Sequence, residues 1–146
     1  MLPKTQEANT FLHKVLHKAF VESFGLSHQF FFLEFRDEAG EDHLLNIDTE
    51  VTSNYEWDES WGLTEEERVL VLFNKVNLKY LTYIACDDET NLVLRFENGI
   101  VVRLNGSTAH GYPEPWTLGN SPSQRPGGYT LRAFSGDTYS ISQYSA

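Results

Sequence analysis

Apolar and polar residues alternate along two segments of the chain that share one plan. Residues 91–105 read NLVLRFENGIVVRLN, and residues 30–48 read FFFLEFRDEAGEDHLLNID. In each segment a Leu-x-Phe step leads into an acidic corner that contains glycine. Side chains alternate between the two faces of a strand, so each segment predicts a β-hairpin. The later hairpin turns at Asn98 and Gly99, which is a strong signal for a two-residue turn.

A different spacing marks two helices. Over residues 6–24 apolar side chains recur every three or four positions, which predicts an amphipathic helix that starts near Thr5 and ends near Gly25. Thr64 and Glu67 form the pattern of a capping box with an acidic first turn, so a second helix is predicted to begin there. The apolar run that follows is short, and a strand is the alternative for it.

Shorter alternating stretches complete the pattern. Further strands are predicted at residues 80–86, 116–118, 129–134 and 138–143. Several short strands with one or two helices indicate an α+β fold whose mainly antiparallel sheet has about six to eight strands. We expect the N-terminal helix and the second, short helix to pack on that sheet. The length indicates one domain, residues 1–146, with loose ends at 1–5 and 144–146.

The charge of the chain restricts its partners. Twenty-one acidic residues face eleven basic ones, for a formal net charge of −10. Nucleic acid is disfavoured because phosphates are bound by Lys and Arg, whereas a basic protein would be attracted. Solubility alone is the simpler explanation of the charge. No apolar run reaches the roughly 20 residues that span a bilayer. We see no signal peptide and only one cysteine, so we expect a cytoplasmic protein.

Groups able to bind metal are weakly patterned. His13 and His17 are four residues apart and could face one metal ion. The stretch lacks the acidic residue that follows the first His of a zinc-protease helix, and the two neighbouring lysines, Lys14 and Lys18, repel a cation, so a solvated helix face is favoured. We expect His28, His43 and His110 to lie at the surface or at strand ends. The sequence therefore predicts no metal site and no cofactor.

Catalytic groups are weakly patterned as well. Cys86 precedes Asp87 and Asp88, and nearby anions raise the pKa of a thiol, so a buried structural role is favoured over a nucleophilic one. No serine sits in a Gly-x-Ser-x-Gly turn. A pair of carboxylates across a cleft stays open, because spacing in sequence does not settle distance in space. We predict no catalytic residue.

The segment 53–62, SNYEWDESWG, is the best candidate for a functional surface. Trp and Tyr are frequent hot spots of interfaces, and acidic neighbours would steer a basic partner towards them. The alternative is that Trp57 and Trp61 fold back as a lid over the core. The predicted partner-binding residues are Tyr55, Glu56, Trp57, Asp58, Glu59, Trp61, Glu65 and Glu66.

The last third of the chain carries a resemblance. It contains Leu92-x-Leu94-x-Phe96-x-Asn98-Gly99, then Val101-x-Arg103, then Glu114-x-Trp116-x-Leu118, and then Gly127-Gly128. Over residues 70–141 this resembles small bacterial domains of unknown function that occur among the immunity proteins of toxin systems. In those domains a Tyr-Glu-x-Trp stretch follows the hairpin. Here Pro113 takes the Tyr position and Tyr112 lies one residue earlier. The resemblance implies a non-enzymatic intracellular domain that neutralises a toxin.

Three functions follow as hypotheses. The first is an acidic protein-binding module, most concretely an immunity protein that occludes a basic toxin domain. The second is a small-ligand-binding or weakly hydrolytic domain with a cleft between helix and sheet. The third is a structural subunit that forms a homodimer through the aromatic residues 30–35. We also expect Trp116 to be buried in the core, with Glu114 exposed or paired with Arg125 or Arg132.

Overall fold

The computed structural model describes residues 1–107, 113–120 and 126–144. Within that part of the chain there are two α-helices, α1 (Pro3–Val15) and α2 (Glu65–Val76), and a short 3-10 helix, η1 (Glu59–Trp61). A six-stranded sheet contains, in spatial order, β1 (Phe20–Ser27), β2 (Phe30–Arg36), β3 (Asp42–Ile47), β8 (Trp116–Asn120), β9 (Tyr129–Ala133) and β10 (Tyr139–Gln143). A four-stranded sheet contains β4 (Val51–Ser53), β7 (Val101–Leu104), β6 (Leu92–Phe96) and β5 (Leu81–Cys86).

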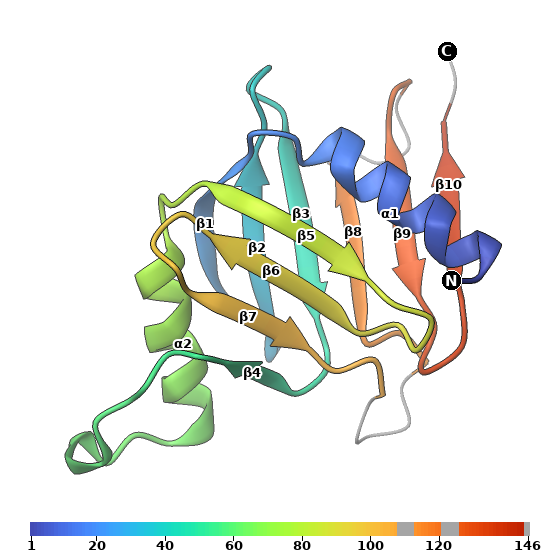
Figure 1. The fold of residues 1–146 in the computed structure, drawn as a ribbon. Helices are drawn as coiled ribbons and strands as arrows, with labels where there is room; N and C mark the ends of the chain where they lie inside the picture. Colours follow the sequence, from blue (N-terminus) through green and yellow to red (C-terminus); the bar gives the residue numbers. More distant parts are fainter. Residues whose placement is uncertain (108–112, 121–125, 145–146) are drawn as a thin grey trace.

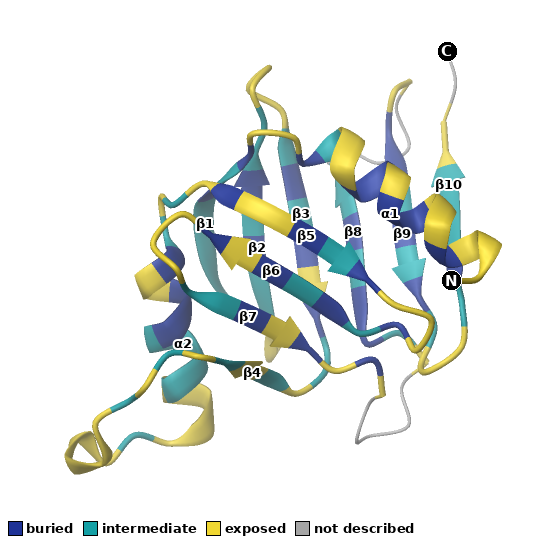
Figure 2. Cartoon of the chain, in the orientation of Figure 1, coloured by how far each residue is buried: buried dark blue, intermediate teal, exposed yellow. Residues whose placement is uncertain are grey.

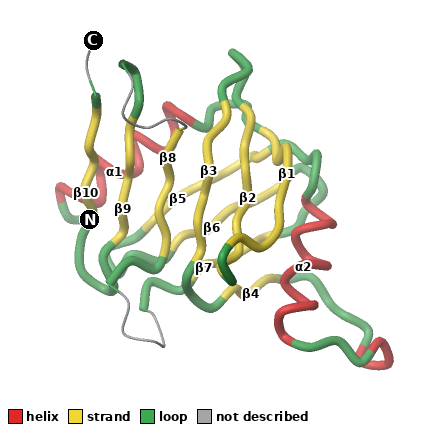
Figure 3. Tube along the Cα trace, turned by 180° about the vertical axis from the view of Figure 1, so that it is seen from behind, coloured by secondary structure: helices red, strands yellow, loops and turns green. Residues whose placement is uncertain are grey.

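These elements form two layers. The four-stranded sheet lies across one face of the six-stranded sheet, with the strands of the two sheets crossing (Figure 1). Helix α1 lies beside β5 in the layer of the four-stranded sheet and covers β10 of the other sheet. Helix α2 packs near β1, at the opposite side of the molecule. Figure 3 shows the other face of the six-stranded sheet, which neither helix crosses. The predicted α+β class with antiparallel sheets is confirmed, with ten strands in the described residues.

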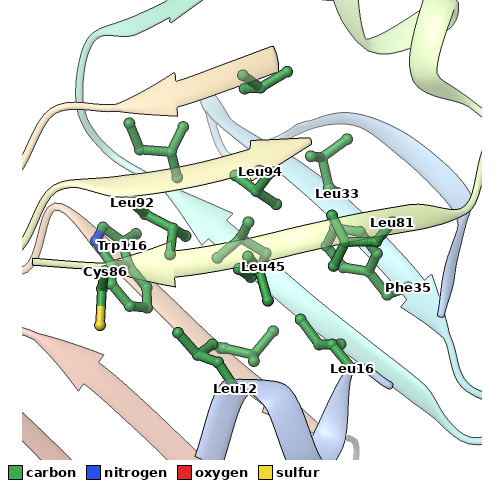
Figure 4. Close-up of a cluster of buried hydrophobic side chains, with 14 of the residues drawn as sticks. Leu12, Leu16, Leu33, Phe35, Leu45, Leu81, Cys86, Leu92, Leu94 and Trp116 are labelled. Carbon is green, nitrogen blue, oxygen red and sulfur yellow. The ribbon is translucent and has the colours of Figure 1, made fainter. Parts of the chain in front are cut away.

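The core lies between the two sheets and joins the two look-alike hairpins. Leu33 and Leu45 come from β2 and β3, and Leu92 and Leu94 come from β6 (Figure 4). All four are buried, and Trp116 of β8 lies in the same cluster, as predicted. Each such side chain contributes about 1.5–3 kcal/mol by leaving water. The shared interior therefore fixes how the two hairpins stack.

One predicted helix is half wrong. Helix α1 begins at Pro3, so Thr5 is not its cap but a buried residue of its first turn, and residues 3–5 are not loose. The helix stops at Val15, and Lys18 then takes a positive φ of 56°. Residues 20–27 form β1 and pair with β2, and Gly25 lies inside that strand. Helical spacing was misleading because pairing along β2 outweighs local propensity.

Other local predictions are confirmed. Thr64 Oγ1 accepts a hydrogen bond from the N–H of Glu67 (3.2 Å), and Glu67 Oε1 accepts one from the N–H of Thr64 (2.9 Å), so the capping box exists. The hydrogen bond from the Thr64 N–H, helped by the neighbouring Thr64 hydroxyl, lowers the pKa of the Glu67 carboxyl. The segment after Thr64 is helix α2 and not a strand. The hairpins β2–β3, β6–β7 and β9–β10 all form.

The outer edge of β5 is covered by side chains of α1. The register with β6 turns the backbone groups of Ile84 and Cys86 away from that partner strand. The Asn9 amide hydrogen-bonds both the C=O (2.9 Å) and the N–H (2.8 Å) of Cys86, and His13 Nε2 donates to the carbonyl of Ile84 (2.7 Å). His13 and His17 are both exposed, as predicted for a solvated helix face, and His13 also has a structural partner in the Ile84 carbonyl.

Candidate partner-binding surface

Local hydrogen bonds shape the segment that leads from β4 to α2. Asp58 Oδ1 accepts hydrogen bonds from the hydroxyl (2.7 Å) and the backbone N–H (2.9 Å) of Ser60. These two bonds lower the pKa of the Asp58 carboxyl. Gly62 ends the 3-10 turn with a left-handed φ of 64°, which glycine adopts without steric strain. The tip of the segment is exposed (Figure 2).

Trp57 fixes this segment to α2. Its indole Nε1 donates a hydrogen bond to the carbonyl of Arg68 (2.9 Å), and its ring meets that of Tyr55 edge-on, with centroids 5.5 Å apart. Both rings are half-buried against the core. Trp61, by contrast, is 50% exposed. Only one of the two tryptophans considered for a lid therefore folds back.

A groove of about 590 Å³ opens between Trp57, β4 and the first turns of α2. This volume falls in the range of ligand-binding clefts, about 300–1,000 Å³. We call it the acidic groove and define it by its lining residues: Phe31, Thr49, Glu50, Val51, Trp57, Glu65, Glu66, Arg68 and Val69. Its lining combines apolar surface with three carboxylates and one guanidinium. Such a surface suits a partner group that is apolar along its length and cationic at its end.

The structure brings together three of the eight predicted partner-binding residues. Trp57, Glu65 and Glu66 line the acidic groove. Tyr55 is not part of the groove lining but contacts the ring of Trp57 edge-on. The prediction therefore located one wall of the groove.

The other four predicted residues lie on the segment but outside the groove lining. Asp58 serves as the cap of η1, and the carboxylate of Glu59 lies 3.3 Å from the guanidinium of Arg68 at the surface. Exposed pairs of this kind contribute little to stability. Glu56 and Trp61 are exposed. They could meet only a partner that extends beyond the groove.

Sequence reasoning missed the opposite wall. Phe31 belongs to β2, and Glu50 and Val51 lie at the start of β4, a strand that the pattern did not separate from the preceding hairpin. A three-residue strand carries too little alternation to be recognised. Phe31 was noted only as part of an aromatic run. No local signal connects these residues to Trp57, because the sheets bring them together.

His43 was expected at the surface or at a strand end. It is the second residue of β3 and so lies at a strand end, but it is not at the surface: it is 4% exposed and lies between two polar partners. His43 Nε2 donates to Asp37 Oδ2 (2.8 Å), and His43 Nδ1 lies 2.7 Å from the Tyr129 hydroxyl. Burial raises the pKa of Tyr129, which therefore keeps its proton. The three side chains form a satisfied polar network beneath α1.

This network borders an open pocket of about 450 Å³ whose other walls include Lys14 and Glu41. A ligand-binding or hydrolytic role would be favoured by a carboxylate with a raised pKa. Burial alone would raise the pKa of Asp37, but the hydrogen bonds from His43 and from the N–H groups of Glu41 and Ala39 outweigh it and lower that pKa. Asp37 thus behaves as a structural anion.

Three carboxylates gather on the six-stranded sheet. Single oxygens of Glu22, Glu34 and Asp42 lie within 4.8 Å of one another. Arg36 already sits among them, with Nε 2.9 Å from Asp42 and Nη2 3.8 Å from Glu22. Burial, together with the neighbouring Glu22, raises the pKa of Glu34. The guanidinium accounts for this cluster as a surface ion-pair network.

The aromatic strand β2 is divided between two faces. Leu33 and Phe35 are buried, and Phe31 contacts Phe73 of α2 with ring centroids 6.0 Å apart. Phe30 is 40% exposed and borders an open hollow of about 460 Å³ together with His28, a surface residue as predicted. A homodimer through this strand could therefore use Phe30 but not the inward-facing rings.

The residues of the resemblance have structural roles. Trp116 is buried and its Nε1 donates to the carbonyl of Thr90 (2.8 Å), while Glu114 pairs with Arg132 at 3.4 Å. Both outcomes were predicted. Tyr112, Arg125 and His110 lie outside the described residues. These contacts explain the stretch as an architectural feature of β8.

Comparison with known proteins adds no family. No family model, no curated protein and no solved structure matches this chain. The resemblance to immunity-type domains therefore stays a hypothesis. None of the helices in the described residues is both long and apolar enough to cross a membrane.

Proposed function

We propose that this chain is a non-enzymatic, acidic protein-binding module whose partner is a basic protein, most concretely a toxin domain that it neutralises by occlusion. The observation that carries the proposal is the acidic groove, whose lining includes Trp57 and other apolar residues as well as Glu50, Glu65 and Glu66. The net charge of −10 adds a long-range attraction for a cationic partner.

The groove provides both affinity and steering. Trp57 is pre-organised, because its hydrogen bond to Arg68 and its contact with Tyr55 leave little side-chain freedom to lose on binding. A half-buried, fixed Trp is a typical interface anchor. Glu65 and Glu66 are exposed in the first turn of α2 and act as rim charges, which mainly accelerate association. Recognition of this kind needs no reacting group on the chain.

The proposal is tested with the purified product of the gene immediately upstream. Its binding to this chain is measured by calorimetry at about 50 mM and about 300 mM salt, since screening weakens rim charges. We expect Trp57→Ala to weaken binding about thirtyfold, as for an interface anchor. The double variant E65K/E66K should weaken it about tenfold, mainly by slowing association. Both carboxylates are exposed, so this variant tests the groove without disturbing the core.

The matched control is Glu38→Lys, in the exposed β2–β3 turn. That turn lies at the opposite end of β2 from Phe31, about 20 Å away for a strand of this length. The control should bind within twofold of the unchanged chain. A neighbouring product that does not bind, or binding that ignores the groove variants, would overturn the proposal.

A further inference from the structure

Within residues 1–107, 113–120 and 126–144, the outer edge of β4 carries backbone groups without a partner. Asn105 N–H donates to the carbonyl of Glu50 (3.1 Å), and Asn54 N–H donates to that of Val101 (3.3 Å), so alternate residues of this strand face β7. Thr52 lies midway between Glu50 and Asn54 and, like them, directs its N–H and C=O groups towards β7. Val51 and Ser53 lie at the intervening positions and direct their N–H and C=O groups away from β7. Among the described residues these groups have no hydrogen-bond partner.

The other edge of the same sheet is treated differently. There, Asn9 and His13 of α1 bond the backbone groups that Cys86 and Ile84 turn outwards. Exposed strand edges are a liability that proteins normally cover. The four-stranded sheet thus has one edge closed by side chains of α1, whereas its edge at β4 is left open by the part of the chain that the structure describes.

The open edge adjoins the acidic groove. Val51 lines the groove together with Phe31, Trp57 and Val69, and Glu50 stands at the start of the strand. An added strand would place alternate side chains over this apolar lining and its remaining side chains towards solvent and the surrounding carboxylates. A second copy of this chain would bring Glu50, Glu65 and Glu66 against like charges, whereas a basic segment would be attracted.

We propose that the partner binds by strand addition: an extended segment that alternates Lys or Arg with apolar residues pairs with the free edge of β4 along the acidic groove. This inference rests on the proposed function and specifies how the basic partner is recognised. The three residues of β4 offer the N–H and C=O groups of Val51 and Ser53, spaced two residues apart as a paired strand requires.

The test uses a defined probe, an acetylated and amidated heptapeptide of alternating Lys and Val. Its binding is measured by calorimetry with this chain and with Glu66→Lys, and Glu38→Lys serves as the control. A second peptide of the same sequence carries methyl groups on its central amide nitrogens. It keeps the charge but cannot donate backbone hydrogen bonds. Strand addition predicts at least tenfold weaker binding of the methylated peptide and of Glu66→Lys.

Hydrogen exchange measured by NMR gives an independent readout. In the free protein the amides of Val51 and Ser53 should exchange fast and that of Thr52 slowly. Saturating peptide should slow exchange at Val51 and Ser53 at least tenfold and leave Thr52 unchanged. Strand addition would be overturned if the peptide bound without slowing amide exchange at Val51 and Ser53. It would also be overturned if the methylated peptide bound with equal affinity, or if no binding occurred at millimolar peptide.

The two proposals fail separately. If the upstream product binds and depends on Trp57 while Val51 and Ser53 stay unprotected, the proposed function stands and strand addition fails. If the free protein is a dimer by light scattering with Val51 and Ser53 already protected, the edge is occupied by a second copy. That result would overturn the inference of a basic segment.

Discussion

The side-chain amide of Asn9 takes the place of a neighbouring strand for Cys86. It donates to the carbonyl of Cys86 and accepts from its N–H, at 2.9 and 2.8 Å, across 77 residues of sequence. Both groups of Cys86 are buried and would otherwise lack a partner. Each unsatisfied buried group costs about 1–3 kcal/mol. The contact therefore joins α1 to the four-stranded sheet.

We expect Asn9→Ala to lower the free energy of unfolding by about 2–4 kcal/mol, because two backbone groups lose their partner. Urea denaturation followed by circular dichroism measures it. Asn74→Ala on the exposed side of α2 is the control and should change stability by less than about 0.5 kcal/mol. Equal stability of the two variants would contradict the role assigned to Asn9.

The second prediction concerns acid. The lowered pKa of Asp37 means that its contribution to stability is present above the ordinary carboxyl pKa and is lost as the pH falls through the folded value. Asp37→Asn should therefore be less stable than the unchanged chain at about pH 5, and this difference should shrink towards about pH 2. Thermal melts across that window measure it. Glu38→Gln, in the exposed turn nearby, should show no such convergence.

The Cys86 thiol should be inert in the folded protein. It is 4% exposed, and burial raises its pKa to about 11, so only a small fraction is thiolate near neutral pH. An aromatic disulfide reagent at about pH 8 should label it only after guanidinium unfolds the chain. Cys86→Ser provides the blank. Rapid, stoichiometric labelling of the native protein would show that the site is open.

Gly106 should not tolerate a side chain. A Cβ there would overlap the carbonyl oxygen of Glu89 and lie 2.7 Å from Thr90 Oγ1, which itself donates to the Gly106 carbonyl (3.0 Å). Gly106→Ala should lower the free energy of unfolding by about 3 kcal/mol or more. Gly40 has a left-handed φ of 83° but open space around an added Cβ. Gly40→Ala should therefore lower the free energy of unfolding by only about 1 kcal/mol. Similar losses for both would argue against crowding at Gly106.

The features that the sequence predicted correctly depend on residues close together in the chain, whereas the features that it missed depend on residues far apart. The capping box of Thr64 and Glu67 spans four residues, and the turn at Asn98 and Gly99 spans two, so local chemistry determines both. Residues 20–24 continue the helical spacing of apolar positions, yet they form part of β1. Their partner strand, β2, and the positive φ at Lys18 decide the outcome. Periodicity carries no information about that pairing.

The candidate site shows the same limit. Trp57, Glu65 and Glu66 were found because aromatic and acidic residues alternate within one short segment. Phe31 and Glu50 come from a different sheet and a different loop, and nothing near them in the sequence marks a groove. The environment of His43 was missed for the same reason, because Tyr129 is 86 residues away. Long-range packing creates both features.

An unpaired strand edge also bears on how this protein behaves at high concentration. Such edges invite identical chains to stack into fibres, and charged residues around them act as gatekeepers. Around β4 the charged residues in this gatekeeper position are Glu50, Glu65 and Glu66. Replacing the three with Gln should make neutral solutions turbid on standing, whereas the unchanged chain stays clear by light scattering. The anionic rim would then serve colloidal stability as well as recognition.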